Sequence, residues 1–413
     1  MEMIELNEVQ ERVLLIGVQE MDGDDTEESL QELGELAQTA GAEVLGTVIQ
    51  RRESVHPGTY IGKGKIDEVR ELLWETEATG VICDDELSPA QMNNLQQELE
   101  CKVMDRTLLI LDIFARHATT SEGKLQVELA QLRYRAARLA GLGNSLSRLG
   151  GGIGTRGPGE KKLEMDRRVI RTRISRLKQE LEEVVRHRDL IRGRRRKSEQ
   201  KVVALVGYTS VGKSALFRAL TGADVLEDAK LFATLDTTTR GIRLSGKQEV
   251  LLTDTVGFIR KLPHHLVEAF KSTLEEACCA DILIHVVDAS SAQMEQQMGV
   301  VYETLHQLGA DDRPVITVFN KQDLLPERRV CRDRHAEACV PASAHTGEGL
   351  EEIRGAIEQI LRDDKIYIER LYPYEKAGLL QLIRRKGELM AEEYRAEGIF
   401  VQAYVPADIY MDV

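Results

Sequence analysis

One glycine-rich loop has the residue types and spacing of a phosphate-binding loop. It reads G-x-x-x-x-G-K-S, directly after the apolar run VVALV and before the helical pattern ALFRAL. Glycines let backbone N–H groups curl around a phosphate, the lysine can reach the β- and γ-phosphates, and the serine hydroxyl can coordinate Mg²⁺. A tight glycine turn is the alternative, but the strand–loop–helix context favours phosphate binding. The residues of this loop are Gly207, Tyr208, Thr209, Ser210, Val211, Gly212, Lys213 and Ser214.

A second motif, Asn320-Lys321-Gln322-Asp323, follows the strand-like run RPVITVF and predicts which base is bound. The Asp323 carboxylate only accepts hydrogen bonds, so it suits the paired N–H donors of guanine. Adenine would leave that carboxylate unpaired and would be rejected. Lys321 can lie along the base, and Asn320 can tie this loop to the phosphate loop. A helix-capping loop is the alternative reading of the motif.

Three further segments complete a nucleotide site. Asp254 ends an apolar strand, where it can hold Mg²⁺ through water, and the N–H of Gly257 can meet the γ-phosphate. We expect Thr234 to close over Mg²⁺, with Thr237, Thr238 and Thr239 as competitors. A run after the strand-like ACVP can contact guanine O6 through backbone N–H groups. These segments are Phe232, Ala233, Thr234, Leu235 and Asp236; Asp254, Thr255, Val256 and Gly257; and Ser343, Ala344 and His345.

The five motifs, in this order, predict a GTPase that uses GTP or GDP and Mg²⁺, with Ser214, Thr234 and Asp254 as the metal-binding residues. The catalytic residue is not identified. Phe258 stands where many GTPases carry a glutamine that orients the attacking water, and phenylalanine cannot do this. We therefore expect slow intrinsic hydrolysis, unless a residue elsewhere in the chain or a partner completes the site.

The elements that must position these residues follow a regular order. Residues 13–116 alternate between β-rich runs and helical patterns, which predicts a small parallel α/β domain. Ser88 is the expected N-cap of the helix over 88–99. Residues 201–362 repeat the α/β alternation. The C-terminal segment predicts a strand, a helix over 376–394 and a strand.

The region between the two α/β patterns is different. Gln126 to Leu139 has a helical pattern, and the glycine-rich run 141–160 is predicted to be neither regular helix nor strand. After it, apolar residues recur in steps of seven or of four and three, which predicts a helical hairpin or short coiled coil. The seam could pack within one chain or between two. Its residues are Leu163, Ile170, Ile174, Leu177, Leu181, Val184 and Ile191.

The charge distribution marks the same region. The chain of 413 residues has a formal net charge of −14, with 55 Lys and Arg against 69 Asp and Glu. Residues 131–200 nevertheless form a basic stretch, and five of the six positions 192–197 are Arg or Lys. A basic segment on an acidic protein indicates contact with a polyanion at one place. A solvated helical surface is the alternative.

Composition excludes several classes of protein. The overall charge argues against a uniformly basic nucleic-acid binder. No apolar run approaches the ~18 to 20 residues of a membrane span. No cysteine lies in a CxxC pair, so we expect neither a zinc site nor a disulfide scaffold, but reduced thiols in a cytoplasmic protein. The cysteines are Cys83, Cys101, Cys278, Cys279, Cys331 and Cys339.

The predicted fold is thus an α/β chain with four parts. They are an N-terminal α/β domain (1–117), a helical hairpin with the glycine-rich loop (118–199), a Ras-like GTPase domain (200–364) and a small C-terminal βαβ domain (365–413).

Specific stretches of the sequence resemble the HflX family of translational GTPases over nearly the whole chain. They include PGTYIGKGK at 57–65, Asp105-Arg106 with LDIFARHA, and SRLGGGIGTRGPGEKKLEMDRR at 147–168. A hydrophobic residue at position 258 also matches that family. Ser210 departs from the asparagine frequent in family phosphate loops, and 160–163 read Glu-Lys-Lys-Leu where Glu-Thr-x-Leu is common.

The resemblance implies binding to the large ribosomal subunit and splitting of stalled or idle ribosomes under stress, with GTP as the switch. The basic hairpin and its glycine-rich loop would then contact ribosomal RNA, and the free protein is expected to be a monomer. A GTP-gated ribosome-assembly or docking factor without splitting activity remains an alternative. A GTP-gated remodeller of free RNA is another.

Overall fold

The computed structural model divides into two compact units. The first comprises Met1–His187, Ala229–Asp236 and Arg260–Lys271, and the second comprises Arg188–Asp228, Thr237–Ile259 and Ser272–Val413. The structure describes residues 10–20, 25–149, 158–197, 200–222, 232, 237–244, 249–261, 277–328, 331–363, 365–376, 378–406, 409–410 and 413.

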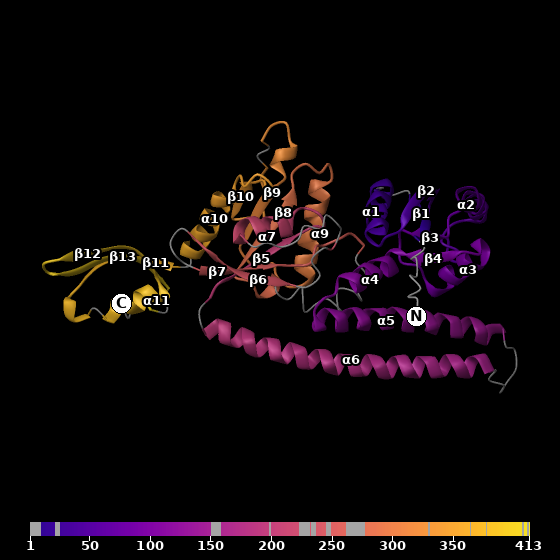
Figure 1. Cartoon of the computed structure of the whole chain (residues 1–413), viewed down its shortest axis with the longest axis horizontal. Helices are drawn as coiled ribbons and strands as arrows, with labels where there is room; N and C mark the ends of the chain where they lie inside the picture. The colour runs from indigo at the N-terminus through magenta and orange to yellow at the C-terminus, as the bar shows by residue number, and fades with distance from the viewer. Residues whose placement is uncertain are drawn as a thin grey trace, which may run out of the picture. The chain divides into compact units, whose positions relative to one another are not determined.

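The first unit is built on a four-stranded parallel sheet in the order β2-β1-β3-β4 (Figure 1). Helices alternate with the strands, which confirms the predicted parallel α/β arrangement of this part. The strands are β1 (Arg12–Glu20), β2 (Glu43–Arg52), β3 (Gly80–Cys83) and β4 (Lys102–Asp105). The helices are α1 (Thr26–Thr39), α2 (Lys63–Thr76), α3 (Pro89–Leu99) and α4 (Arg106–His117).

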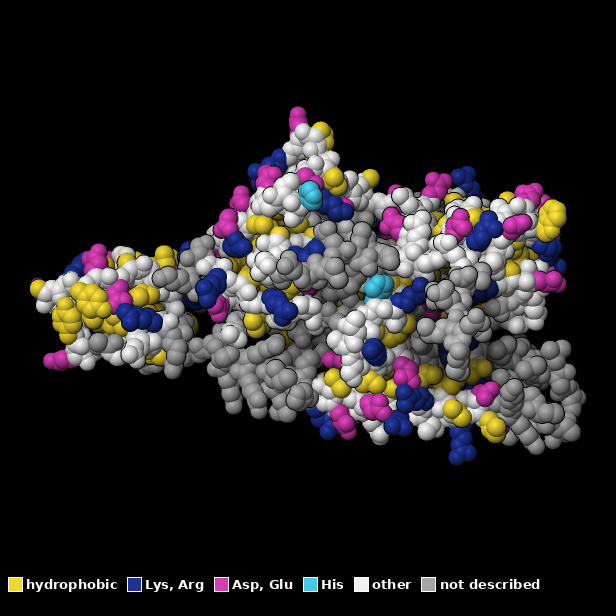
Figure 2. Space-filling model, viewed as in Figure 1, with side chains coloured by type: hydrophobic (Ala, Val, Ile, Leu, Met, Phe, Trp, Pro, Cys, Tyr) yellow, Lys and Arg dark blue, Asp and Glu magenta, His cyan; other side chains and the backbone are white. Residues whose placement is uncertain are grey.

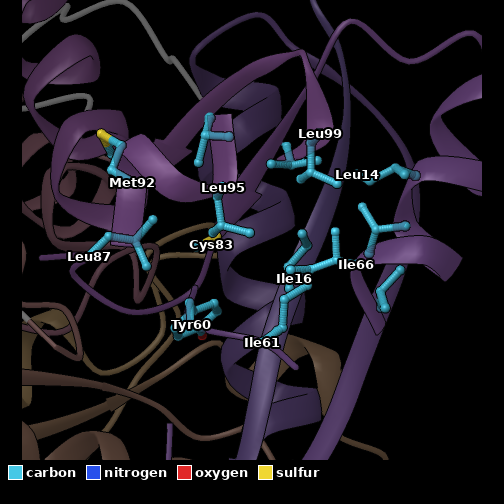
Figure 3. Packing of buried hydrophobic residues seen from close by; sticks show 14 of the residues in the cluster. Leu14, Ile16, Tyr60, Ile61, Ile66, Cys83, Leu87, Met92, Leu95 and Leu99 are labelled. Atoms are coloured by element: carbon cyan, nitrogen blue, oxygen red, sulfur yellow. The ribbon is translucent and has the colours of Figure 1, made fainter. Parts of the chain in front are cut away.

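Local signals in the sequence explain these boundaries. Ser88 caps α3 through a capping box with Gln91, as predicted, because its side chain accepts from the Gln91 N–H. Asp105 caps α4 through one hydrogen bond, which its side chain accepts from the N–H of Leu108. Buried apolar residues from β1, α2 and α3 then close one side of the sheet; Figure 3 shows Leu14, Ile16, Ile66, Leu95 and Leu99 among them.

Two long helices follow, α5 (Ser121–Leu149) and α6 (Pro158–Lys197), and Figure 1 shows them lying alongside each other. The Arg173 guanidinium of α6 forms two hydrogen bonds with the Glu128 carboxylate of α5, at 2.8 and 2.9 Å. On α6, Leu177 is fully buried, and the other seam positions with described side chains, Ile170, Ile174, Leu181 and Val184, are partly buried. This confirms the predicted hairpin, which packs within one chain.

The prediction for the glycine-rich run was wrong at both of its ends. Residues 141–149 continue α5 and residues 158–160 begin α6. Only two glycines interrupt 141–149, each costing a helix about 1 kcal/mol relative to alanine, and tertiary packing of a long helix can offset that cost. Residues 150–157 of the run lie outside the described residues.

The second unit contains a six-stranded sheet in the order β10-β9-β8-β5-β7-β6. β6 pairs antiparallel with β7, and the other pairs are parallel. The carboxyl ends of parallel strands meet at one edge of such a sheet, which is where ligands of open α/β folds bind. The elements are β5 (Val202–Gly207), α7 (Lys213–Thr221), β6 (Thr238–Arg243), β7 (Glu249–Asp254), β8 (Ile282–Asp288), α9 (Met294–Gln307), β9 (Val315–Asn320), β10 (Ala338–Pro341) and α10 (Leu350–Asp363).

The C-terminal part is a three-stranded antiparallel sheet in the order β11-β13-β12, with one helix. Its elements are β11 (Lys365–Tyr372), α11 (Gly378–Lys386), β12 (Glu388–Arg395) and β13 (Gly398–Pro406). The predicted helix over 376–394 is therefore wrong in its second half. The run ELMAEEYR has helix-forming residues, but pairing with β13 overrides that local preference.

Two expectations from composition can be compared with the structure. All six cysteines are free thiols. Among the described residues, no helix combines the length and the apolar character that crossing a membrane would require.

Candidate nucleotide-binding site

The glycine-rich loop joins β5 to α7, as predicted from its flanking patterns. Gly207 and Gly212 have φ angles of 154° and 93°, which side chains rarely adopt. A Cβ at Gly207 would lie 2.3 Å from the carbonyl oxygen of Val286, and one at Gly212 would lie 2.4 Å from Asn320 Nδ2. Both positions therefore require glycine. Ser210 has φ 57°, a conformation that asparagine tolerates more readily than serine does.

Lys213 is buried, and its ammonium is held toward the loop. Its Nζ donates to the carbonyl oxygens of Gly207 at 3.0 Å and Tyr208 at 2.5 Å. Burial lowers the pKa of Lys213 to about 8, although the charge of Asp254 opposes that shift. Gly257 brings the chain close to this group, since a Cβ there would lie 3.0 Å from Nζ. A buried ammonium that is held by carbonyl oxygens is well suited to an anionic ligand.

Two oxygen ligands suited to a hard cation meet beside the lysine. The Ser214 hydroxyl, at the start of α7, donates to Asp254 Oδ2 at the end of β7 over 2.8 Å. Thr255 anchors the segment after β7, because its hydroxyl donates to the Leu205 carbonyl at 2.6 Å. Hydroxyl and carboxylate oxygens are the donors that Mg²⁺ prefers, so the residues present fit that ion.

Phe258 is buried and joins the phosphate loop through its backbone. Its N–H donates to the Gly207 carbonyl at 3.0 Å, and its carbonyl accepts from the Thr209 N–H at 2.8 Å. The side chain is only 1% exposed. Its hydrocarbon ring has no group that could orient a water molecule.

Asn320 connects the phosphate loop to two other loops. It is 2% exposed at the end of β9, where its Nδ2 donates to the Val211 carbonyl at 2.8 Å and its Oδ1 accepts from the Ala344 N–H at 2.9 Å. The Ser343 hydroxyl donates to Asp323 Oδ1 at 2.5 Å. The structure thus brings the three predicted segments together at the carboxyl ends of their strands.

The two loops assigned to guanine also carry Lys321, Gln322 and His345. Lys321 has φ 62° and forms an ion pair with Asp288 at the end of β8, at 2.7 Å. The N–H of Gln322 donates to the Ala342 carbonyl at 3.2 Å. His345 is exposed beyond Ala344.

The segment with the favoured threonine is only partly described. Ala233, Thr234, Leu235 and Asp236 lie outside the described residues. Phe232 is buried, and its ring packs edge-to-face on Phe114 in the first unit, with centroids 4.7 Å apart. Among the competing threonines, Thr239 lies in β6, and its hydroxyl is 3.0 Å from that of Thr253.

Two basic residues that were not predicted from the sequence follow directly after the Asp254–Phe258 segment. Arg260 pairs with Asp25 at 2.7 Å, and Lys261 pairs with Asp84 at 2.5 Å and Asp85 at 2.6 Å, all within the first unit. Each partner lies far away along the chain, so no local pattern indicates these pairs.

Asp84 belongs to a buried charged cluster at the carboxyl end of the first sheet. Arg106, only 1% exposed, donates to Asp84 Oδ1 at 2.7 Å and to the Ser29 carbonyl at 2.8 Å. Burial alone would raise the pKa of Asp84, but the charges of Arg106 and Lys261 outweigh burial and lower it. Arg106 is the first residue of α4, and Asp105, its N-cap, directly precedes it, so the start of this helix places Arg106 in the cluster.

Sequence comparison decides the family. Three family models match in succession: "GTP-binding GTPase N-terminal" over residues 27–115, "GTP-binding GTPase Middle Region" over 117–195 and "50S ribosome-binding GTPase" over 202–321. The GTPase HflX of Lacrimispora saccharolytica is 60% identical over 409 residues, which cover 99% of this chain and 97% of that protein. The chain belongs to the HflX family.

Other relatives extend over similar lengths. The GTPase HflX of Escherichia coli is 43% identical over 90% of this chain and 86% of its own length. A solved structure of a GTP-binding protein from Sulfolobus solfataricus in complex with GDP is 26% identical, with a TM-score of 0.44 and coverage of 84% of this chain and 98% of that one. As an HflX protein, the chain is a GTPase whose nucleotides are GTP and GDP.

Proposed function

We propose that this HflX protein binds the large ribosomal subunit in its GTP form and promotes dissociation of stalled or idle ribosomes. The observation that carries the proposal is the position of the buried Asn320 side chain. It hydrogen-bonds to the phosphate loop at Val211 and to the loop of Ala344, and Asn320 itself begins the other loop assigned to guanine. Such a junction couples nucleotide contacts to the shape of the domain that carries them.

Residues Gly207 to Ser214 are proposed to hold the phosphates. The two glycines allow the loop its positive φ angles, which suit backbone N–H groups that surround a phosphate, and Lys213 adds a buried positive charge to the loop. Ser214 and Thr234 would hold Mg²⁺, with Asp254 acting through water. When bound, the ion neutralises phosphate charge during transfer of the γ-phosphoryl group.

Asp323 is proposed to select guanine, with Ser343 positioning its carboxylate. The hydrogen bond between them leaves Asp323 Oδ2 available to accept from the base. Lys321, Gln322, Ala344 and His345 are assigned to the same pocket from their place on the two loops.

Hydrolysis is proposed to depend on a group that the described residues of the phosphate site do not supply. Phe258 occupies the position where a glutamine orients water in many GTPases, and its ring is buried against the domain. A bound partner that completes this site would couple hydrolysis to docking.

The hairpin is proposed to contact ribosomal RNA. We place it at residues 118–199, between an N-terminal domain at 1–117 and a GTPase domain at 200–364, with a C-terminal domain at 365–413. The exposed face of α6 carries Arg168, Arg171 and Lys178, and phosphate neutralisation requires such groups. The glycines between α5 and α6 would permit close approach of the backbone to the partner.

GTP turnover with and without purified large subunits tests the proposal, with light scattering followed on intact ribosomes. Stimulated turnover and a fall in scattering with a non-hydrolysable GTP analogue support splitting. Stimulation without a scattering change would instead support a docking or assembly factor. Tight, salt-sensitive binding of free RNA without stimulation by subunits would support the RNA remodeller.

A charge-reversal pair sharpens that experiment. Arg168→Glu with Arg171→Glu should weaken subunit binding and lower the slope of log affinity against log salt by roughly one to two, because each lost phosphate contact removes about 0.7–0.9. Arg313→Glu makes the same type of change at an exposed position outside the hairpin. That control should bind as the parent does, with unchanged GTP affinity in all three proteins.

A further inference from the structure

Among the described residues of the C-terminal part, helix α11 covers one face of the sheet. On that face, Ile368, Val401 and Val405 pack into one buried cluster with Leu380 and Ile383 of the helix. Side chains alternate along a strand, so the residues between these positions point to the opposite face.

That opposite face carries a row of large apolar side chains, here termed the open sheet face: Tyr367 and Leu371 of β11, and Phe400 and Tyr404 of β13. Tyr367 lies opposite Tyr404, with ring centroids 5.2 Å apart, and Leu371 lies opposite Phe400. Tyr367 is 46% and Leu371 41% exposed. Figure 2 shows hydrophobic side chains gathered at the surface of this C-terminal part.

Composition also marks the C-terminal part, where Tyr367 and Tyr404 are the two tyrosines on the open sheet face. Of the ten tyrosines in the chain, six lie between residue 365 and the C-terminus, and only Tyr372 among them is fully buried. Tyrosine is enriched in protein interfaces, because it gives a large contact area at low entropic cost and keeps a polar end.

The charges around the row decide which partner fits. Glu369 lies between Tyr367 and Leu371 on the same face of β11. Arg395 stacks on the Phe400 ring at 3.9 Å, but its charge is paired with Glu393 at 2.7 Å. The face therefore offers exposed apolar surface with a net negative rim.

The two basic residues at the other end of the row are also paired. Lys365 lies 3.8 Å from Glu388, and Arg362 lies 3.7 Å from Glu358. Arg362 lies 5.7 Å from the Tyr404 ring centroid and pairs with the buried Glu388 at 2.7 Å. A negative rim repels nucleic-acid phosphates, and it equally repels the same face of a second copy. A protein segment that combines apolar side chains with Lys or Arg is complementary to it.

We propose that the open sheet face docks a basic protein segment of the large ribosomal subunit, with apolar contacts over Tyr367 and Leu371 and a cation facing Glu369. The inference rests on the proposed ribosome binding and assigns a protein-binding role to the C-terminal part. RNA contact is left to the basic hairpin.

A photoreactive benzoylphenylalanine in place of Tyr367 tests the inference in the full chain, mixed with purified large subunits and a non-hydrolysable GTP analogue. The matched control has the same group in place of Tyr394, which is 68% exposed. The Tyr394 hydroxyl bonds to Glu392, whose carboxylate pairs with Arg384 of α11, so Tyr394 lies on the helix side of the sheet. We expect position 367, and not 394, to cross-link to a lysine- or arginine-rich ribosomal protein.

Two variants measure the apolar and the ionic contributions separately. Leu371→Ser should lower the cross-link yield at position 367 at least about fivefold, the scale of an interface anchor. Glu369→Lys should lower it about threefold or more, and the effect should shrink at high salt. Both positions are exposed, so thermal unfolding should match the parent.

Cross-links to RNA, to another copy of this chain, or at only the level seen for position 394 overturn the inference. So does a yield that neither variant changes. Co-sedimentation of the same mixture distinguishes failure of the docking face from failure of ribosome binding. If the protein still sediments with the subunit, the proposed function stands and only the docking face is lost, whereas failure to sediment removes both.

Discussion

Asn320→Ala removes the side chain that joins the phosphate loop to the loops assigned to guanine. The parent side chain makes two hydrogen bonds, to the Val211 carbonyl and the Ala344 N–H, in a site that is 2% exposed. A buried backbone group that loses its partner costs about 1–3 kcal/mol, so the two together cost about 2–6 kcal/mol. Each 1.4 kcal/mol corresponds to a tenfold change in affinity.

Part of the free energy lost with these two hydrogen bonds lowers the stability of the free protein, and the remainder weakens nucleotide binding. We expect GDP affinity to fall about 10- to 100-fold, measured by titration with a fluorescent N-methylanthraniloyl-GDP. Asn94→Ala is a matched control, because Asn94 also donates one side-chain hydrogen bond, to the Gly58 carbonyl at 2.7 Å, but in the first unit. The control should lower thermal stability and leave GDP affinity unchanged. A folded Asn320→Ala protein that binds GDP within twofold of the parent would refute the reasoning.

Four further predictions follow from the same geometry. Asp323→Asn should shift preference from guanine to xanthine nucleotides in a competition titration; unchanged selectivity would contradict the guanine assignment. Ser214→Ala should abolish the Mg²⁺ dependence of GTP affinity, measured with and without chelator, and retained dependence would contradict the metal role. Burial holds the pKa of Lys213 near 8, and bound phosphate favours its ammonium form. GDP affinity should therefore fall above pH 8, and binding at that pH should take up a proton, which calorimetry in two buffers measures; binding without proton uptake would disprove it. Leu177→Ala, at a fully buried seam position, should destabilise the hairpin by about 2–5 kcal/mol in urea unfolding without affecting GDP affinity, and an unchanged midpoint would show that the seam does not stabilise the hairpin.

The sequence alone predicted the elements that depend on local signals. The parallel alternation of the first unit, the Ser88 cap and the glycine loop between β5 and α7 all agree with the structure. Each depends on a period of two or 3.6 residues, on a capping residue, or on a backbone angle that only glycine adopts easily. Such signals are contained in a few consecutive residues.

The two incorrect predictions have a common cause. Residues 141–149 are helical despite their glycines, and residues 388–395 form a strand despite helix-forming composition. In both places the local preference is weak, about 1 kcal/mol per residue or less, and packing or strand pairing with distant residues outweighs it.

The candidate site was also determined partly by the sequence and partly by the tertiary structure alone. Residue types and order determined which atoms could contact phosphate, magnesium and guanine, because that chemistry depends on the donor and acceptor groups of each side chain. Only the tertiary structure placed Asn320 between Val211 and Ala344, and Lys261 beside Asp84 and Asp85. Contacts between residues so far apart along the chain leave no periodic trace in one sequence, since the folded sheet alone brings the loops together.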